Sequence, residues 1–138
     1  MPTTPSATYS NDRLLPLQLT TGDNLPEFPV KLATGTYAQG TILGEVTATP
    51  GIYKAYNNAN SDGSEVARLI LSYGCTVDGS GNIALANEHG QTRTSVPALM
   101  GGTFKTSDLT GLDANGLADL GGRVVKGTVA SGIVHIPV

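Results

Sequence analysis

Short stretches in which apolar and polar residues alternate begin at Phe28 and recur along the rest of the chain. In the first of them, Phe28, Val30 and Leu32 alternate with Pro29 and Lys31. A period of two residues is typical of a β-strand with one buried face. Further strands are expected at residues 41–47, 52–56, 66–73, 123–129 and 133–138. The pattern therefore predicts a mainly β domain.

Turn-forming residues separate the expected strands. Pro50-Gly51 follows the second strand, and residues 78–82 have the sequence Asp-Gly-Ser-Gly-Asn, which favours a tight turn. Gly101-Gly102 predicts a bulge or a sharp bend. The one helical candidate is residues 113–120, where Asp113 suits the N-cap and two glycines follow the last turn. We expect one short helix.

Residues 1–27 have a different pattern from the rest of the chain. Prolines interrupt any helix in this segment, and Thr, Ser, Asn and Asp fill most of the gaps. Leucine nevertheless occurs at Leu14, Leu15, Leu17 and Leu19, the last three with the period of a strand. We therefore expect residues 1–27 to be an extended N-terminal arm anchored by these leucines. Residues 28–138 would form the β-rich domain.

The stretch after Asp62-Gly63 is the most strand-prone part of the chain. Asp62 and Gly63 predict a turn, and Leu69 and Leu71 share one face of the following strand, with Ile70 on the other. Apolar residues on both faces indicate that both faces are covered. We expect Asp62 and Gly63 to form a structural turn, and Leu69 and Leu71 to lie in the core.

Composition and charge exclude several classes of partner. The formal net charge is −3, the pI is about 5.1 and only 14% of residues are charged. The eight Lys and Arg residues are scattered, so we expect no nucleic-acid partner. No apolar run is long enough to span a membrane, and residues 1–6 do not resemble a signal peptide. The single cysteine, Cys75, is expected to be buried.

Candidate chemical motifs are incomplete. Asp78, Ser80 and Asn82 begin like a calcium loop, but Ile83 replaces the required glycine and His89 the bidentate glutamate. Residues 122–128 resemble a phosphate loop only loosely and suit a strand better. None of the eleven Asp and Glu residues stands in an apolar setting that would raise its pKa. We expect no catalytic residues, no metal, no cofactor and no enzymatic activity.

The order of segments in the middle of the chain resembles a known family. The segments are residues 40–47 (Gly-Thr-Ile-Leu-Gly-Glu-Val-Thr), 51–53 (Gly-Ile-Tyr), 62–71 (Asp-Gly-Ser-Glu-Val-Ala-Arg-Leu-Ile-Leu) and 102–104 (Gly-Thr-Phe). In this order they resemble the lambda-type head decoration proteins of tailed bacteriophages. The resemblance covers roughly residues 37–138.

The resemblance implies a fold, partners and a location. The fold would be a small β-barrel-like or β-tulip-like domain with little helix. The protein would be made in the host cytoplasm and would reside on the outer surface of the virion capsid. There it would form homotrimers at three-fold and quasi-three-fold positions of the expanded shell and bind the major capsid protein through its N-terminal arm. Its role would be to cement the shell against internal pressure, without chemistry.

Two points leave the assignment open. Residues 77–97 form a longer segment than the resemblance leads us to expect, and a phage-specific or host-specific outer loop would explain it. A Gly- and Thr-rich β domain also suits a tail or adhesin module that binds a host glycan. Glycan sites usually need exposed aromatic side chains, and this chain has no Trp, two Phe and five Tyr, several of them in expected core strands. Capsid decoration is the preferred hypothesis.

Overall fold

The first strand of the described residues closes the barrel at the centre of the fold. The structure is a computed structural model that describes residues 27–88 and 90–137. Five strands form the closed barrel in the order β1-β4-β3-β5-β8. Their bounds are β1 Glu27–Leu32, β3 Ile42–Glu45, β4 Ile52–Ala55, β5 Leu69–Leu71 and β8 Val96–Leu99. β1 closes the barrel by pairing parallel to β4 and antiparallel to β8.

Two prolines face each other across the β1–β8 pair. The register places Pro29 opposite Pro97. Opposed residues of an antiparallel pair either exchange backbone hydrogen bonds with each other or make none. Since neither proline has an N–H to donate, Pro29 and Pro97 can face each other only as a pair that exchanges no backbone hydrogen bonds.

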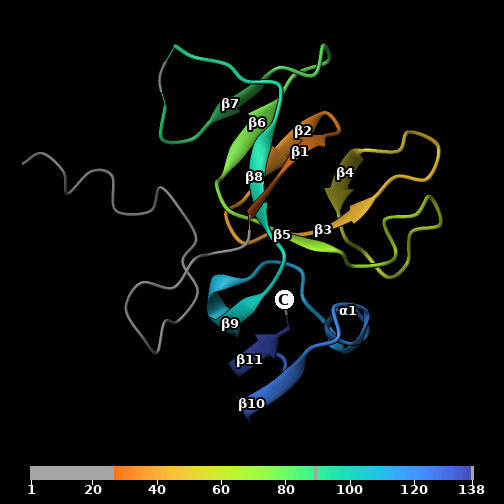
Figure 1. Ribbon diagram of the computed structural model, residues 1–138, viewed down its shortest axis with the longest axis vertical. Helices are drawn as coiled ribbons and strands as arrows, with labels where there is room; N and C mark the ends of the chain where they lie inside the picture. The colour runs from red at the N-terminus through yellow and green to blue at the C-terminus, as the bar shows by residue number, and fades with distance from the viewer. Residues whose placement is uncertain (1–26, 89, 138) are drawn as a thin grey trace, which may run out of the picture.

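Two three-stranded sheets extend from opposite ends of the barrel (Figure 1). The first has the order β2-β6-β7, and the second has the order β10-β11-β9. Both are antiparallel. Their strands are β2 Gly35–Tyr37, β6 Cys75–Val77, β7 Ile83–Leu85, β9 Gly102–Lys105, β10 Arg123–Gly127 and β11 Gly132–Ile136.

The short strand β5 divides the core into two clusters. Leu69 and Leu71 pack in one cluster with side chains of β1, β2, β6, β7 and β8. Ile70, on the other face of β5, packs in a second cluster with Phe104, Val134 and residues of the helix region. Each of the three β5 side chains is buried. The expectation that both faces of this strand are covered is confirmed.

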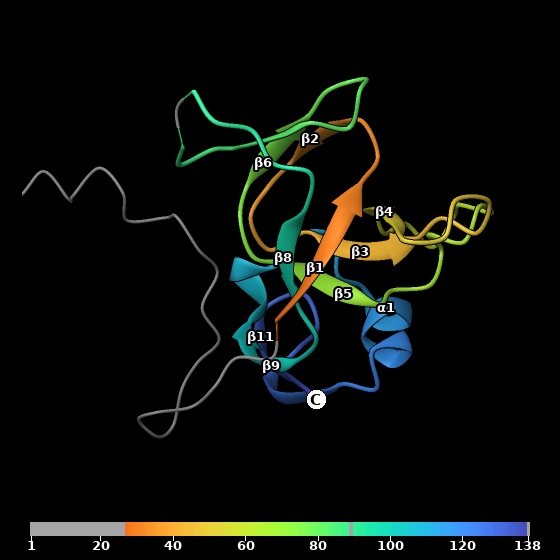
Figure 2. The same ribbon diagram turned by 45° about the horizontal axis from the view of Figure 1, so that its top comes forward.

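The helix α1 (Ala114–Asp119) lies at the same end of the molecule as β9 and β11 (Figure 2) and contributes Leu117 to the second cluster. The Asp113 carboxylate accepts a hydrogen bond from the Gly116 backbone N–H at 2.7 Å, which caps the first turn. Leu117 is buried, and Leu120 packs against the same cluster. Gly121, with φ of +69°, ends the helix. A 3-10 turn, η2 (Thr106–Asp108), precedes it.

The expected mainly β fold with one short helix is confirmed for the described residues, as are the turns at Pro50-Gly51 and at residues 78–82. Three details differ from the sequence expectation. The strand expected at residues 66–73 is only Leu69–Leu71, because hydrogen bonds of the preceding turn extend to Val66. Phe28 belongs to β1 but is 46% exposed. The segment 77–97 contains β7, whose Ile83 and Leu85 are buried in the core, so it is only in part a loop.

Candidate interaction surfaces

The four leucines proposed as anchors, Leu14, Leu15, Leu17 and Leu19, lie outside the described residues. The structure does describe the place where their segment joins the domain. β1 begins at Glu27, whose register partner on β8 is Leu99. Two exposed apolar residues, Phe28 and Met100, lie at this end of the β1–β8 pair, with 46% and 41% of their surface exposed. The junction is therefore firmly paired and partly apolar.

The Asp62–Gly63 turn is held by hydrogen bonds from three directions. The Asp62 carboxylate accepts from the Ser64 backbone N–H at 3.1 Å and from the Lys54 ammonium at 2.9 Å. The Asp62 carbonyl oxygen accepts from the Thr47 N–H at 2.8 Å. The hydrogen bond from the Ser64 hydroxyl, followed by those from Lys54 and the Ser64 N–H, holds the pKa of Asp62 well below its usual range. The turn thus joins the loop to the ends of β3 and β4.

Gly63 is required at this turn for two reasons. Its φ is +107°, a conformation that other residues rarely adopt. A Cβ atom at this position would also clash with the carbonyl oxygen of Glu45. Asp62 and Gly63 form a hydrogen-bonded turn, and Leu69 and Leu71 are core residues. The structure gives all four a role in folding.

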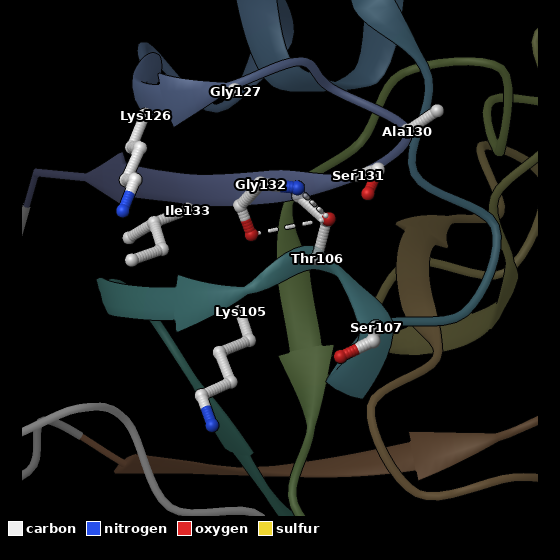
Figure 3. Close-up of a pocket in the computed structure, with 9 residues that line it drawn as sticks. All are labelled: Lys105, Thr106, Ser107, Lys126, Gly127, Ala130, Ser131, Gly132 and Ile133. Carbon is white, nitrogen blue, oxygen red and sulfur yellow. Dashed lines mark hydrogen bonds between the residues drawn. The ribbon is translucent and has the colours of Figure 1, made fainter.

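The sheet β10-β11-β9 exposes a row of basic side chains that the sequence pattern did not reveal. The register aligns Lys126 with Ile133 and Ile133 with Lys105. Directly opposed residues project from the same face of a sheet. Figure 3 shows the three side chains leaving their strands in the same direction. The next row on this face contains Arg123, His135 and Thr103. We call these six residues the basic sheet face.

A β-bulge brings Arg123 and Lys126 to the same face. They are three residues apart, and in a regular strand they would project from opposite faces. The register shifts between Val124 and Lys126, so that Val125 is the extra residue. Val125 is 50% exposed. The opposite face of the sheet packs on the core through Phe104 and Val134.

An open groove of about 390 Å³ lies beside the first basic row, at the β10–β11 hairpin. Lys105, Lys126 and Ile133 line it together with residues of η2 and of the hairpin turn. The Thr106 hydroxyl accepts a hydrogen bond from the Gly132 N–H at 2.8 Å, and so fixes η2 to β11 (Figure 3). The exposed hydroxyl side chains of Ser107 and Ser131 also line this groove.

The three cations of the basic sheet face have no ion-pair partner among the described residues. Ion pairs join Lys54 to Asp62 and Arg93 to Glu88 in other parts of the fold. β9, β10 and β11 contain no Asp or Glu. Three of the eight Lys and Arg residues of a chain with a net charge of −3 thus lie on one sheet. This face has a local excess of positive charge.

A second groove, of about 380 Å³, is lined by more acidic than basic side chains. Glu45 and Glu65 flank it together with Arg68 and the 37% exposed Val66. The Glu45 carboxylate accepts from the Gly51 N–H at 2.9 Å, and Glu65 accepts from the Gly63 N–H at 2.7 Å. Both carboxylates are thus engaged in holding turns.

Cys75, His135 and His89 are further side chains that could act as a nucleophile, a base or a metal ligand. Cys75 is buried, and burial raises the pKa of its thiol to about 11, so the thiolate is disfavoured at neutral pH. The Nδ1 atom of His135 lies 2.9 Å from the Thr103 hydroxyl oxygen across the sheet. His89 lies outside the described residues. Within residues 27–88 and 90–137, no group of three or more His, Cys, Asp and Glu side chains is placed to hold a metal.

Among the helices of the described residues, none is both long and apolar enough to cross a membrane. Comparison of the chain with protein-family models, with curated protein sequences and with solved structures finds no match. A function for the chain must therefore be inferred from its own sequence and from the surfaces described above.

Proposed function

We propose that this chain is a capsid decoration protein, which binds the outer surface of a tailed-phage head and stabilises the expanded shell. The resemblance of residues 37–138 to head decoration proteins motivates this proposal. Its partners would be the major capsid protein and two further copies of the chain at three-fold and quasi-three-fold positions. The arm, residues 1–27, would supply the capsid contact through Leu14, Leu15, Leu17 and Leu19.

The structural observation that supports this role is the way β1 enters the barrel. β1 begins at the last residue of the arm, and it pairs with β8 over Glu27–Val30 and with β4 over Lys31 and Leu32. A pull on the arm would therefore act on a strand held by two neighbours, and not on a peripheral loop. Binding of the arm to one capsid subunit would thus anchor the whole β domain through β1.

Cementing by such a protein needs contacts and no catalysis. When one protomer binds several capsid subunits at once, the contacts after the first form at a high effective concentration. Opening the shell then requires all of these contacts to be lost together. Exposed Phe28 and Met100, at the arm end of β1 and β8, are available to extend the contact beyond the arm.

Electron cryomicroscopy of heads mixed with the protein tests the proposal. Expanded, undecorated heads of the phage that encodes the chain are incubated with it and reconstructed. We expect added density at three-fold and quasi-three-fold positions. Heads without added density, or density confined to five-fold vertices, would rule out this role. Density on tails alone would instead favour an adhesin module.

A further inference from the structure

The basic sheet face combines free positive charge with an apolar centre. Lys105, Arg123 and Lys126 are exposed. None of the eleven Asp and Glu residues of the chain lies in β9, β10 or β11. The nearest of them in sequence to Lys105, Asp108 in η2, forms no ion pair with these cations among the described residues. Since these charges are not used to hold the fold, they are available to a partner.

The spacing of the two lysines suits a chain with carboxylates on either side of an apolar residue. Lys105 and Lys126 lie one strand away from Ile133 on opposite sides, so their backbones are roughly 10 Å apart. Their flexible side chains border the groove, and Ile133, partly buried, lies between them (Figure 3). The hydroxyls of Ser107 and Ser131 add hydrogen-bonding groups at its edge.

We propose that the basic sheet face is a docking surface for an acidic segment of a protein partner, whose carboxylates bind Lys105 and Lys126 while an apolar side chain covers Ile133. That this partner belongs to the outer surface of the capsid rests on the proposed function. The face then provides a contact from the β domain itself, in addition to that of the arm.

A protein partner fits this face better than a nucleic acid. A phosphate backbone is bound by many Lys and Arg residues along a continuous track, whereas this face has three, around an isoleucine. The net charge of −3 also opposes the approach of a long polyanion. An apolar centre with a charged rim is typical of protein–protein interfaces.

The bulge indicates that side chains and not an added strand make the contact. β10 is an edge strand of its sheet in the described part of the chain. A bulge at Val125 interrupts the regular spacing of its backbone groups, which opposes pairing with another strand. The same bulge places Arg123 and Lys126 together on the exposed face.

A peptide-binding measurement tests this proposal without capsids. The probe is a fluorescein-labelled peptide with the repeat Glu-Ser-Val-Ser, which in an extended conformation places Glu and Val in turn on one face. The matched control peptide has Gln in place of Glu. Fluorescence anisotropy is recorded with the full chain at low salt and at about 0.5 M salt, where charge interactions are screened within a few ångströms. We expect binding of the Glu peptide, weaker binding of the Gln peptide, and loss of affinity at high salt.

Charge-reversal variants locate the site. Lys126→Glu and Lys105→Glu should each weaken binding of the Glu peptide by at least about fivefold, since an attractive pair becomes a repulsive one. The matched control is Lys31→Glu, an equal charge change at an exposed position of β1. Thermal melts of all three variants verify folding. Equal weakening by Lys31→Glu would overturn the proposal, as would a wild-type chain that binds both peptides equally or binds neither.

Two further comparisons separate the alternatives. If duplex DNA binds the chain more tightly than the Glu peptide, and Lys126→Glu abolishes that binding, the face is a nucleic-acid site and the proposal is wrong. Sedimentation with heads addresses the capsid separately. A chain that binds the Glu peptide through Lys105 and Lys126 but never sediments with heads would refute the proposed function and leave the docking surface in place.

Discussion

The hydroxyl of Tyr56 donates a hydrogen bond to the carboxylate of Asp113, 57 residues further along the chain, at 2.8 Å. The same carboxylate oxygen accepts from the Gly116 N–H at the start of α1. Burial, and then the hydrogen bond to Asp113, raises the pKa of Tyr56 far above its usual value. A Cβ on Gly116 would lie 3.0 Å from the Tyr56 ring, so glycine leaves the space that the ring occupies. This contact joins the segment after β4 to the helix.

Replacing Tyr56 by Phe should lower the free energy of unfolding by about 1.5–3 kcal/mol, because a hydrogen bond to a charged group is lost with little change in packing. Tyr53→Phe is the matched control, since Tyr53 is only partly buried and its hydroxyl has no hydrogen bond among those described. Urea denaturation measures both. A loss at Tyr53 equal to that at Tyr56 would show that the Asp113 contact contributes little.

The two faces of β5 should be equally sensitive to truncation. Leu69→Ala and Leu71→Ala each leave a cavity in one core cluster, and Ile70→Ala leaves one in the other. Each should cost roughly 2–5 kcal/mol in urea denaturation. Val66→Ala, at a position that is 37% exposed, should cost less than about 0.5 kcal/mol. Melts of the Leu69 and Leu71 variants that match the parent would contradict their assignment to the core.

The sequence predicted the elements with strong local signals. The strand-prone segments 123–129 and 133–138 predicted β10 and β11, and Asp113 with Gly121 and Gly122 predicted the limits of α1. β2, β6 and β7 have three residues each, too few to show a period. The parallel pairing of β1 with β4 is non-local, and no pattern within either strand specifies it.

The basic sheet face could not be predicted from the spacing of its residues. Lys105 comes from β9 and Lys126 from β10, and only the register through Ile133 aligns them. Arg123 and Lys126 have the wrong spacing for one face of a regular strand, and a bulge corrects it. The one available signal was the absence of Asp and Glu from residues 120–138. Strand pairing thus brings together Lys and Arg residues that are far apart in the sequence.

Gly63→Ala should destabilise the domain by at least about 1–3 kcal/mol, since it combines a strained φ with a steric clash. The added methyl group would clash with the Glu45 carbonyl oxygen and with Thr47. Gly79→Ala is the control, because a Cβ there meets nothing within 4 Å and its φ is not positive. Thermal melts compare the two variants. Equal melting temperatures would show that the Asp62–Gly63 turn relaxes without cost.

Alkaline pH should unfold the protein partly through Tyr37. Its hydroxyl donates to the Ala33 carbonyl oxygen at 2.7 Å, and burial, with a smaller contribution from Cys75, raises its pKa to about 12. The unfolded chain, with a tyrosine pKa near 10, loses this proton first. The stability contributed by Tyr37 is therefore complete below pH 10 and is lost as the pH rises towards 12.

Urea denaturation of Tyr37→Phe at a series of alkaline pH values isolates this contribution. Between pH 10 and 12 the stability of the variant should fall less steeply than that of the wild type. Because the Cys75 thiol, whose pKa burial raises to about 11, titrates in an overlapping range and contributes to the raised pKa of Tyr37, the comparison is repeated in a Cys75→Ala background. Identical slopes for Tyr37→Phe and wild type above pH 10 would refute a titrating role for Tyr37.

In the proposed role, deleting residues 1–20 should leave the domain folded and strongly weaken its binding to the capsid. The deletion stops short of β1, which begins at Glu27, so both pairings of this strand are retained. In the proposed role the deletion removes Leu14, Leu15, Leu17 and Leu19, each contributing about 1–2 kcal/mol when buried in a partner. The truncated chain should melt like the parent.

Sedimentation with expanded heads measures the loss of binding. A matched variant in which these four leucines become serine, in a chain of full length, separates the leucine contacts from the rest of the arm. If the leucines are the anchors, this variant should bind as weakly as the deletion. A deletion variant that melts like the parent and sediments with undiminished affinity would show that the β domain, and not the arm, holds the protein on the shell.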